Sequence, residues 1–454
     1  MKTLDSRPCV SRLSDVPGAI LESFRDEAAT GKDGVIEVRI GIPAVDPLTW
    51  LANQPRGERL YWSSRDELSA AAAIGVCHQV RIDRPFDYST LTGLVRPGYR
   101  YYGGLRFDPL VQDTDESWRR FGHACFTLPR LEVNNRAGKC FVALRFHYGE
   151  DTTEAAIGRV LERLSWTAAG SFAKPPSMDS ISETPDQSGW CRGVDSALKR
   201  IGDGEIQKVV LSRRQILSLV EQADPIDVLS SLRSHTPNCF HFVFELGSHA
   251  FLGASPELLY RRNGRTITSE AMAGTRLRGG DPGEDRLLGE QLLSSDKDRR
   301  EHRHVADYIT RALRKVCRGD GVDGQARTEL RRLQLVQHLV AHFKGELNPT
   351  VTDADILDVL HPTPAVGGLP RSEALEFIAS TEERDRGWYA GPVGWLGPEG
   401  AEMAVGIRSM LLKPERTAIL FAGCGLVEGS TASGEWEETA AKLAGLRSVF
   451  EEHE

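Results

Sequence analysis

Near its C-terminus the chain reads Gly434-Glu435-Trp436-Glu437-Glu438-Thr439-Ala440-Ala441-Lys442. Taken as a helix at about 100° per residue, this stretch places Glu435, Glu438 and Lys442 on one arc about 60° wide. Two carboxylates and an ammonium on one stripe suit a site for a metal ion and an anion. The alternative is a solvated charged face, in which Glu438 and Lys442 support the helix as an i, i+4 pair.

A second acidic segment lies upstream and begins Ser295-Asp296-Lys297-Asp298-Arg299-Arg300-Glu301. Apolar residues recur at helical spacing behind it, and a serine at 294 or 295 can cap the predicted helix. Asp298 and Glu301 share one side, so the pairs Asp298/Glu301 and Glu435/Glu438 are expected to hold one divalent ion between two helices. Ligands that are all oxygen favour Mg²⁺.

A zinc site is the alternative at the upstream helix. It would use Glu301, His302 and His304, but no HExxH motif and no cysteine-rich partner accompanies them. The sequence therefore favours magnesium.

Composition narrows the functional classes. The 454 residues carry 56 Lys and Arg against 64 Asp and Glu, a net charge of −8, so a nucleic-acid partner is not expected. Eight cysteines without a CxxC pair fit reduced thiols in a cytoplasm. No stretch approaches the roughly 18 apolar residues of a membrane helix, so no membrane partner is expected. We expect a cytoplasmic monomer or weak homodimer.

The hydrophobic pattern divides the chain at residue 189. Residues 1–189 read as a variable N-terminal α/β region packed on a core, and residues 190–454 read as that core. Strand patterns follow one another without a βαβ alternation, which predicts an α/β fold of the α+β type, with large, mostly antiparallel sheets and peripheral helices. The pattern predicts strands at 207–217, 240–246, 250–253, 258–262, 266–269, 391–396, 401–412 and 417–423, and a surface linker at 174–189.

Two residues are candidates for proton transfer. Lys208 lies inside the apolar strand Gln207-Lys208-Val209-Val210-Leu211; it is either an edge-strand lysine or a desolvated amine that acts as a base. Glu257 follows Ser255-Pro256 directly after a strand. It is either an exposed turn carboxylate or a buried acid that keeps its proton at neutral pH.

Further segments suit an anionic ligand. The stretches 273–276 and 422–426 read as glycine turns at strand ends, where backbone N–H groups can approach an anion. Arg408 is expected to project from an apolar strand, as a fork for a carboxylate. The Pro- and Gly-rich stretch 361–370 is typical of a rigid loop that shapes a pocket.

Many of these motifs occur in one order along the chain. They are Lys208-Val209-Val210-Leu211, Ser255-Pro256-Glu257, Ala273-Gly274-Thr275, Asp298 to Glu301-His302, His361-Pro362-Thr363-Pro364-Ala365, Trp388-Tyr389-Ala390-Gly391, Ile407-Arg408, Ala422-Gly423-Cys424-Gly425 and Gly434-Glu435-Trp436 to Lys442. Together they resemble the chorismate-utilising enzymes, and among these most closely the isochorismate synthases. The resemblance covers about residues 190–450 and is looser before them.

The resemblance implies the Mg²⁺-dependent conversion of chorismate to isochorismate, in which water adds at ring C2 and the C4 hydroxyl leaves. It implies that Lys208 activates the water and that Glu257 protonates the departing hydroxyl. Glu301 and Glu438 would hold Mg²⁺, with Asp298 and Glu435 behind them. The expected substrate-binding residues are Gly274, Thr275, His338, Ala365, Arg408, Gly423, Gly425 and Lys442.

Two positions, Lys208 and Ala365, bear on the choice within the family. Lys208 argues against anthranilate synthase, which usually lacks this lysine. Ala365 argues against aminodeoxychorismate and salicylate synthases, which typically have threonine there. Cys424 departs from the common alanine. His338 is matched in many members, but a core histidine on a helical face is an equal alternative.

The leading hypothesis is isochorismate synthesis for menaquinone. A siderophore or salicylate pathway, a salicylate synthase and a catalytically dead relative are the alternatives. The intact Lys208, Glu257, Glu301 and Glu438 argue against the last.

Overall fold

The structure is a computed structural model that describes residues 8–28, 34–93, 95–96, 98–112, 115–147, 153–324, 328–333 and 336–451. Its strands are β1 (Val35–Ile42), β2 (Arg59–Ser63), β3 (Ser69–Ile82), β4 (Tyr101–Leu105), β5 (Ala124–Arg136), β6 (Lys139–His147), β7 (Met178–Thr184), β8 (Lys208–Leu219), β9 (Phe240–Leu246), β10 (His249–Ser255), β11 (Leu258–Asn263), β12 (Thr266–Leu277), β13 (Cys317–Gly324), β14 (Glu329–Arg332), β15 (Val336–Leu347), β16 (Gly368–Leu369), β17 (Pro392–Leu396), β18 (Gly400–Val405), β19 (Ser409–Lys413) and β20 (Thr417–Leu426). Its helices are α1 (Val16–Ala28), α2 (Pro47–Ala52), α3 (Glu154–Glu162), α4 (Gln187–Gly202), α5 (Pro225–His235), α6 (Pro282–Ser294), α7 (Asp296–Val316), α8 (Asp353–Leu360), α9 (Arg371–Thr381) and α10 (Ala432–Arg447).

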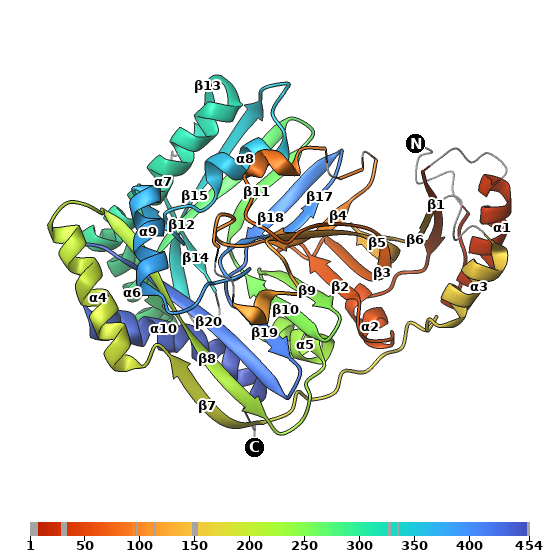
Figure 1. The fold of residues 1–454 in the computed structure, drawn as a ribbon, viewed down its shortest axis with the longest axis horizontal. Helices are drawn as coiled ribbons and strands as arrows, with labels where there is room; N and C mark the ends of the chain where they lie inside the picture. Colours follow the sequence, from red (N-terminus) through yellow and green to blue (C-terminus); the bar gives the residue numbers. More distant parts are fainter. Residues whose placement is uncertain are drawn as a thin grey trace.

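The strands form two long antiparallel branches that separate at β5, and a short third branch runs β5-β6-β1. One branch runs β5-β3-β2-β9-β10-β19-β20-β8-β7. The other runs β5-β4-β17-β18-β11-β12-β15 and ends on β13 and β14. Helices lie outside these strands, with α7 on β12 and α10 on β20 (Figure 1). The prediction of an α+β fold with mostly antiparallel sheets is confirmed.

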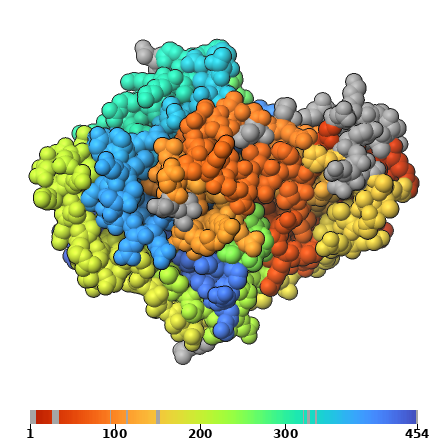
Figure 2. All heavy atoms as spheres, viewed as in Figure 1, coloured from red at the N-terminus to blue at the C-terminus, as the bar shows by residue number. Residues whose placement is uncertain are grey.

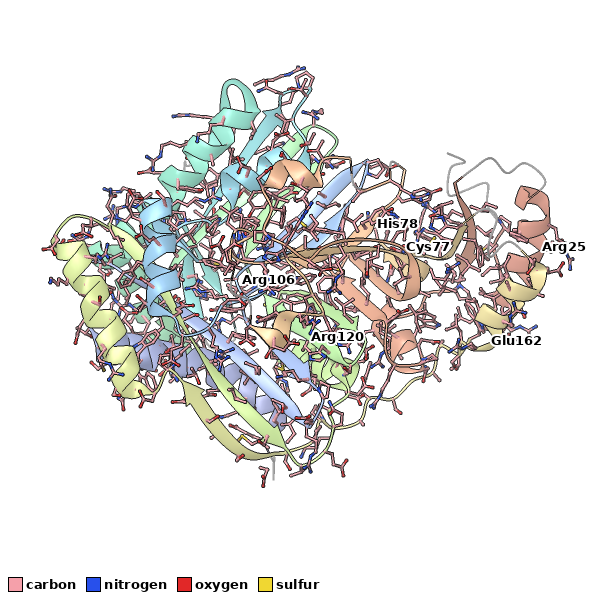
Figure 3. The ribbon with its side chains drawn as sticks, viewed as in Figure 1. Arg25, Cys77, His78, Arg106, Arg120 and Glu162 are labelled. Carbon is pink, nitrogen blue, oxygen red and sulfur yellow. The ribbon has the colours of Figure 1, made fainter. Side chains whose placement is uncertain are left out.

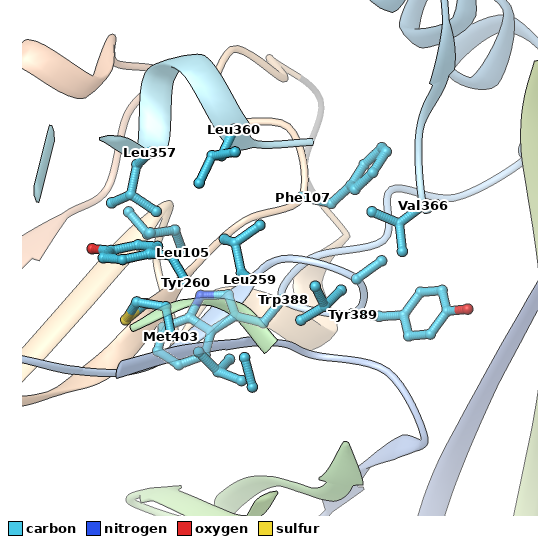
Figure 4. Close-up of a cluster of buried hydrophobic side chains, with 14 of the residues drawn as sticks. Leu105, Phe107, Leu259, Tyr260, Leu357, Leu360, Val366, Trp388, Tyr389 and Met403 are labelled. Carbon is cyan, nitrogen blue, oxygen red and sulfur yellow. The ribbon is translucent and has the colours of Figure 1, made fainter. Parts of the chain in front are cut away.

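The main hydrophobic core draws on both ends of the chain. Leu105 and Phe107 from the N-terminal part lie among Tyr260, Leu357 and Trp388 from the C-terminal part, as Figure 4 shows. Edge-to-face aromatic contacts make the same connection, because the ring centroids of Phe121 and Trp388 lie 5.2 Å apart. Burial of large aromatic side chains is the main favourable contribution to such a core.

The N-terminal region shares its backbone hydrogen bonds with the rest of the sheet. Strand β2 pairs with β9, and β4 pairs with β17. In Figure 2 this segment, in orange, lies against the blue segment near residues 350–400. Figure 3 places Arg106 near the middle of the molecule, where its guanidinium holds Asp385 at 2.7 Å. The division at residue 189 stays a prediction.

The structure corrects two predicted segments. The predicted linker 174–189 contains strand β7 and the start of α4. Strand β7 is an exposed edge strand, so its polar residues hid the pattern. The predicted strand 401–412 is two strands, β18 and β19, separated by Gly406-Ile407-Arg408. Among the described helices, none is both long and apolar enough to cross a membrane.

Candidate active site

One cavity lies where β8 and β20 face β12 and β15, with α7 and α10 at its side. It gathers residues that are far apart in the sequence. The predicted site residues that line it are Glu257, Gly274, Thr275, Glu301, His338, Ala365, Arg408, Gly423, Gly425, Glu438 and Lys442. Three other predicted residues lie next to this lining: Lys208 donates to Glu301, Asp298 lies beside Gly274, and Glu435 lies beside Cys424.

Lys208 occupies the first position of β8 and is buried, with its side chain 1% exposed. Strand β8 pairs with β7, β16 and β20, so the edge-strand alternative is wrong. Its Nζ donates to Glu301 Oε1 at 3.0 Å. A buried nitrogen of this kind needs such a partner, because leaving a polar group desolvated without one is costly.

Because Gly425 has no side chain, it makes room for the Lys208–Glu301 pair. A Cβ at position 425 would be 2.6 Å from Glu301 Oε1 and 2.8 Å from Lys208 Cε. Any larger side chain would therefore displace the pair. The prediction of glycine turns at strand ends is wrong here, because Gly423 and Gly425 lie within strand β20.

The two acidic helices meet as the sequence predicts. Ser295 caps α7 by accepting from the Asp298 N–H, and Asp298 and Glu301 lie in its first turns. Lys297 of α7 donates to Glu435 of α10 at 3.0 Å, which joins the two helices directly. The i, i+4 pair of the alternative is present, since Lys442 donates to Glu438, but the face is not a solvated one, because Glu435 is buried.

Each predicted metal-ligating carboxylate has a cationic partner. Lys442 donates to Glu438 at 2.6 Å, and Arg276 donates to Asp298 at 3.1 Å. Burial raises the pKa of Glu438, but Lys442, Lys297 and Arg408 more than offset it, so the pKa lies below its ordinary value. Glu438 is therefore charged at neutral pH.

The protein offers a metal ion few ligands of its own at this cavity. Among the described residues, no group of three or more His, Cys, Asp or Glu side chains could hold one. Glu301 and Glu438 nevertheless line the same cavity. Mg²⁺ is usually bound by one or two carboxylates together with water and substrate oxygens, so this pair fits its chemistry.

Glu257 stands in a contrasting environment. It is buried directly after β10, in the turn that leads to β11. Ser255 Oγ donates to Val405 O at 2.6 Å, and the Val405 N–H donates to Glu257 O at 3.1 Å, so the turn is tied to β18. Burial raises the pKa of Glu257 to about 8, although Lys208 and Lys442 lower it. The exposed-turn alternative is wrong, and the carboxyl group holds a proton at neutral pH.

His338 lies on strand β15, so the predicted helical face is wrong. It lines the cavity, and its Nδ1 is 3.1 Å from Thr275 Oγ1. Burial, Arg408 and Lys442 lower the pKa of His338 to about 3, so the imidazole is neutral. Gly274 beside it is a strand bulge with φ 77°, a conformation that favours glycine, and not a strand end.

Arg408 reaches the cavity from a backbone break and not from a strand. Its φ of 50° lies in the left-handed region, between β18 and β19. Ala365 lies in the loop after α8, where its N–H donates to Thr363 Oγ1 at 3.2 Å. Burial raises the pKa of the Cys424 thiol, which therefore packs as a small neutral side chain.

Several lining residues were not predicted. Arg386 donates to Val366 O at 2.8 Å and to Val210 O at 2.7 Å, which holds the loop after α8 against β8. Tyr389 and Phe421 stack with ring centroids 5.1 Å apart and form an apolar wall. Tyr389 lay in a quoted motif, whereas an isolated arginine such as Arg386 has no distinguishing pattern in the sequence.

The chain belongs to the chorismate-binding enzyme family, which it matches over residues 21–451. The resemblance seen in the sequence is thereby confirmed.

Particular relatives narrow this further. The chain is 31% identical to isochorismate synthase MenF of Pasteurella multocida, over 90% of this chain and 91% of that protein. It is 38% identical to the salicylate biosynthesis isochorismate synthase of Pseudomonas aeruginosa, over 77% and 74% of the two chains. The structure of MenF, the menaquinone-specific isochorismate synthase from Escherichia coli, superposes with a TM-score of 0.84 at 29% identity, covering 96% of this chain and 99% of that one.

Proposed function

We propose that the chain is an isochorismate synthase, an isomerase that converts chorismate to isochorismate. The observation that carries the proposal is the presence of two buried proton-transfer groups at one cavity: Glu257, which lines it and has a raised pKa, and Lys208, which donates to the lining residue Glu301. The similarity to MenF proteins over nearly the whole chain supports the same reaction.

The proposed reaction is an exchange of hydroxyl groups. Lys208 accepts a proton from a water molecule as the water oxygen bonds to ring C2. The ring double bonds shift and the C4–O bond breaks, while Glu257 gives its proton to the departing oxygen. One water enters and one leaves, so the product is an isomer of the substrate. General acid–base catalysis of this kind contributes about 10²–10⁴-fold to a rate.

The substrate is a dicarboxylate in a protein with a net charge of −8, so it needs local cations. Arg408 and Lys442 line the cavity and supply two. We propose that Glu301 and Glu438 also hold Mg²⁺, with Asp298 and Glu435 behind them. When bound, Mg²⁺ supplies positive charge for a substrate carboxylate.

Menaquinone synthesis is the proposed destination of the product, since the superposition on menaquinone-specific MenF covers almost all of both chains. The relative from Pseudomonas aeruginosa favours salicylate synthesis as the alternative destination. By its name, that protein is also an isochorismate synthase. We propose a cytoplasmic enzyme that is a monomer or weak homodimer.

The deciding experiment is to incubate purified protein with chorismate and Mg²⁺ and to separate isochorismate, salicylate and anthranilate by chromatography. Isochorismate as the main product is expected. Salicylate with released pyruvate would instead identify a salicylate synthase, and unchanged chorismate would identify a binding protein.

A further inference from the structure

The turn between β2 and β3 brings Arg65 of the N-terminal region to the back of the Ser255-Pro256-Glu257 turn. Strand β2 pairs with β9, which fixes the position of this turn on the sheet. The Arg65 guanidinium lies 5.3 Å from the centroid of the Phe240 ring, and its side chain is 19% exposed. A planar, partly buried guanidinium of this kind is held in one orientation.

Arg65 and Arg331 of β14 bind the same carboxylate from two sides. Arg65 donates to Glu270 at 2.6 and 2.7 Å, and Arg331 donates to it at 2.7 and 3.1 Å. Glu270 belongs to β12 and is buried, and the two arginines and His342 hold its pKa far below the ordinary value despite burial. These two bidentate ion pairs make Arg65, Glu270 and Arg331 a rigid cluster.

The same Arg65–Glu270–Arg331 cluster also contacts the backbone just before Glu257. Arg65 Nη1 donates to Pro256 O at 3.0 Å, and Arg331 Nη1 lies 3.5 Å from that oxygen. This carbonyl belongs to the peptide that joins Pro256 to Glu257. The Glu257 carbonyl on the other side is held by the Val405 N–H at 3.1 Å. Both peptides that flank Glu257 are therefore fixed, and with them the direction of its side chain.

We propose that Arg65 is a positioning residue for the proton donor Glu257, acting with Arg331 through the carbonyl of Pro256. The inference rests on the proposed function and gives the N-terminal region a part in positioning the proton donor. Arg65 lines none of the cavity and acts through Glu257. Proton transfer depends steeply on geometry, because a displacement of about 1 Å can cost about 10²-fold in rate.

The test is a double-mutant cycle measured as kcat for isochorismate formation. Arg65→Ala is expected to lower kcat about 10- to 100-fold with little change in KM. In a Glu257→Gln background the same change is expected to cost less than about threefold, because the group it positions is gone. Arg331→Ala, which removes the second arginine of the cluster, is expected to behave in the same way. Arg65→Lys restores the charge without the fork and is expected to fall between Arg65→Ala and the wild type.

Arg233→Ala is the matched control. Arg233 binds Glu67 in the same β2–β3 turn and Asp46, with comparable exposure, but makes no contact with Pro256. Its kcat is expected to remain near that of the wild type. Equal losses for Arg65→Ala with and without Glu257, or equal losses for Arg233→Ala, would overturn the proposal in favour of a purely structural ion pair.

Hydrogen exchange by mass spectrometry gives a readout that does not need turnover. Exchange in a peptide covering residues 252–260 is expected to speed up in Arg65→Ala and Arg331→Ala but not in Arg233→Ala. Wild-type protein that makes no isochorismate would sink the proposed function, while unchanged exchange in Arg65→Ala would sink the positioning role by itself.

Discussion

Glu257 and Glu438 line the same cavity but differ in charge. Glu257 lies in a turn of the sheet, and burial raises its pKa to about 8. Glu438 lies on helix α10, where Lys442 contacts it at 2.6 Å and nearby cations keep its pKa below the ordinary value. The same side chain is thus suited to donate a proton at one position and to remain an anion at the other. Burial raises the pKa of both glutamates, but only at Glu438 do the neighbouring cations outweigh it.

Substitutions of the cavity carboxylates on helices α7 and α10 are expected to cause the largest loss of activity. Glu301→Ala and Glu438→Ala are each expected to lower kcat at least about 10³-fold, because the cavity loses a carboxylate proposed to hold Mg²⁺. EDTA is expected to abolish activity and Mg²⁺ to restore it. Glu437→Ala, on the exposed side of α10, is the matched control and should be active. Full activity in excess EDTA would remove the metal from the mechanism.

Substitutions of the proton-transfer residues on the sheet are expected to cause a large but smaller loss of activity. Lys208→Ala and Glu257→Gln are each expected to lower kcat about 10²–10⁴-fold with a modest change in KM, because each removes one proton-transfer group. Circular dichroism checks that each variant is folded. Near-normal kcat in Lys208→Ala would show that the lysine only balances the charge of Glu301.

The pH profile distinguishes the two glutamates. Activity is expected to fall about tenfold per unit above pH 8, where Glu257 loses its proton. The Glu257→Gln variant should lose this alkaline limb, whereas Glu437→Ala should keep it. An unchanged limb in Glu257→Gln would assign it to another group of the coupled site.

Stability should follow the same titration with a definite sign. The folded-state pKa of Glu257 is raised from 4.5 to about 8, so the folded protein binds its proton more tightly than the unfolded chain. The stability that this proton contributes is full below pH 4.5 and is lost as the pH rises towards 8. Relative to Glu257→Gln, the wild-type Tm should therefore fall across this range. Parallel Tm curves would contradict the assignment.

The smallest expected effect concerns product choice. Ala365→Thr adds a hydroxyl group to the cavity lining and is expected to lower isochorismate formation and raise the small share of pyruvate-releasing product. A lactate-dehydrogenase-coupled pyruvate assay, run beside the isochorismate assay, measures the ratio. An unchanged ratio at a reduced rate would indicate overpacking of the loop instead.

The motif residues were predictable because each lies in a local pattern. The cap at Ser295 and the apolar stripe of helix α7 are visible in the sequence. The prediction that α7 and α10 meet is also correct. Arg408 was found, but its backbone break was not, because an apolar run such as 401–412 gives no sign of a left-handed residue within it. Exposed strand β7 read as a linker for the opposite reason, since nothing buries its alternate residues.

Residues that act through tertiary contacts were beyond the sequence. Arg65 and Arg331 are arginines among many, and only the pairing of β2 with β9 and of β14 with β15 brings them to one carboxylate. Lys297 was visible within the quoted helix, yet its contact with Glu435 depends on how two distant helices cross. Local periodicity reports which face is buried and not which partner buries it.

The pairing of β4 with β17 has a consequence for how the protein is made. Residues 101–105 emerge from a ribosome long before their partner strand, residues 392–396. Strand β4 must therefore wait, with its backbone groups unpaired on that side, while the residues between the two strands are synthesised. Such long-range pairing slows folding and exposes strand edges meanwhile. Synthesis of this protein should accordingly depend on chaperones more than that of a chain whose strands pair with their sequence neighbours.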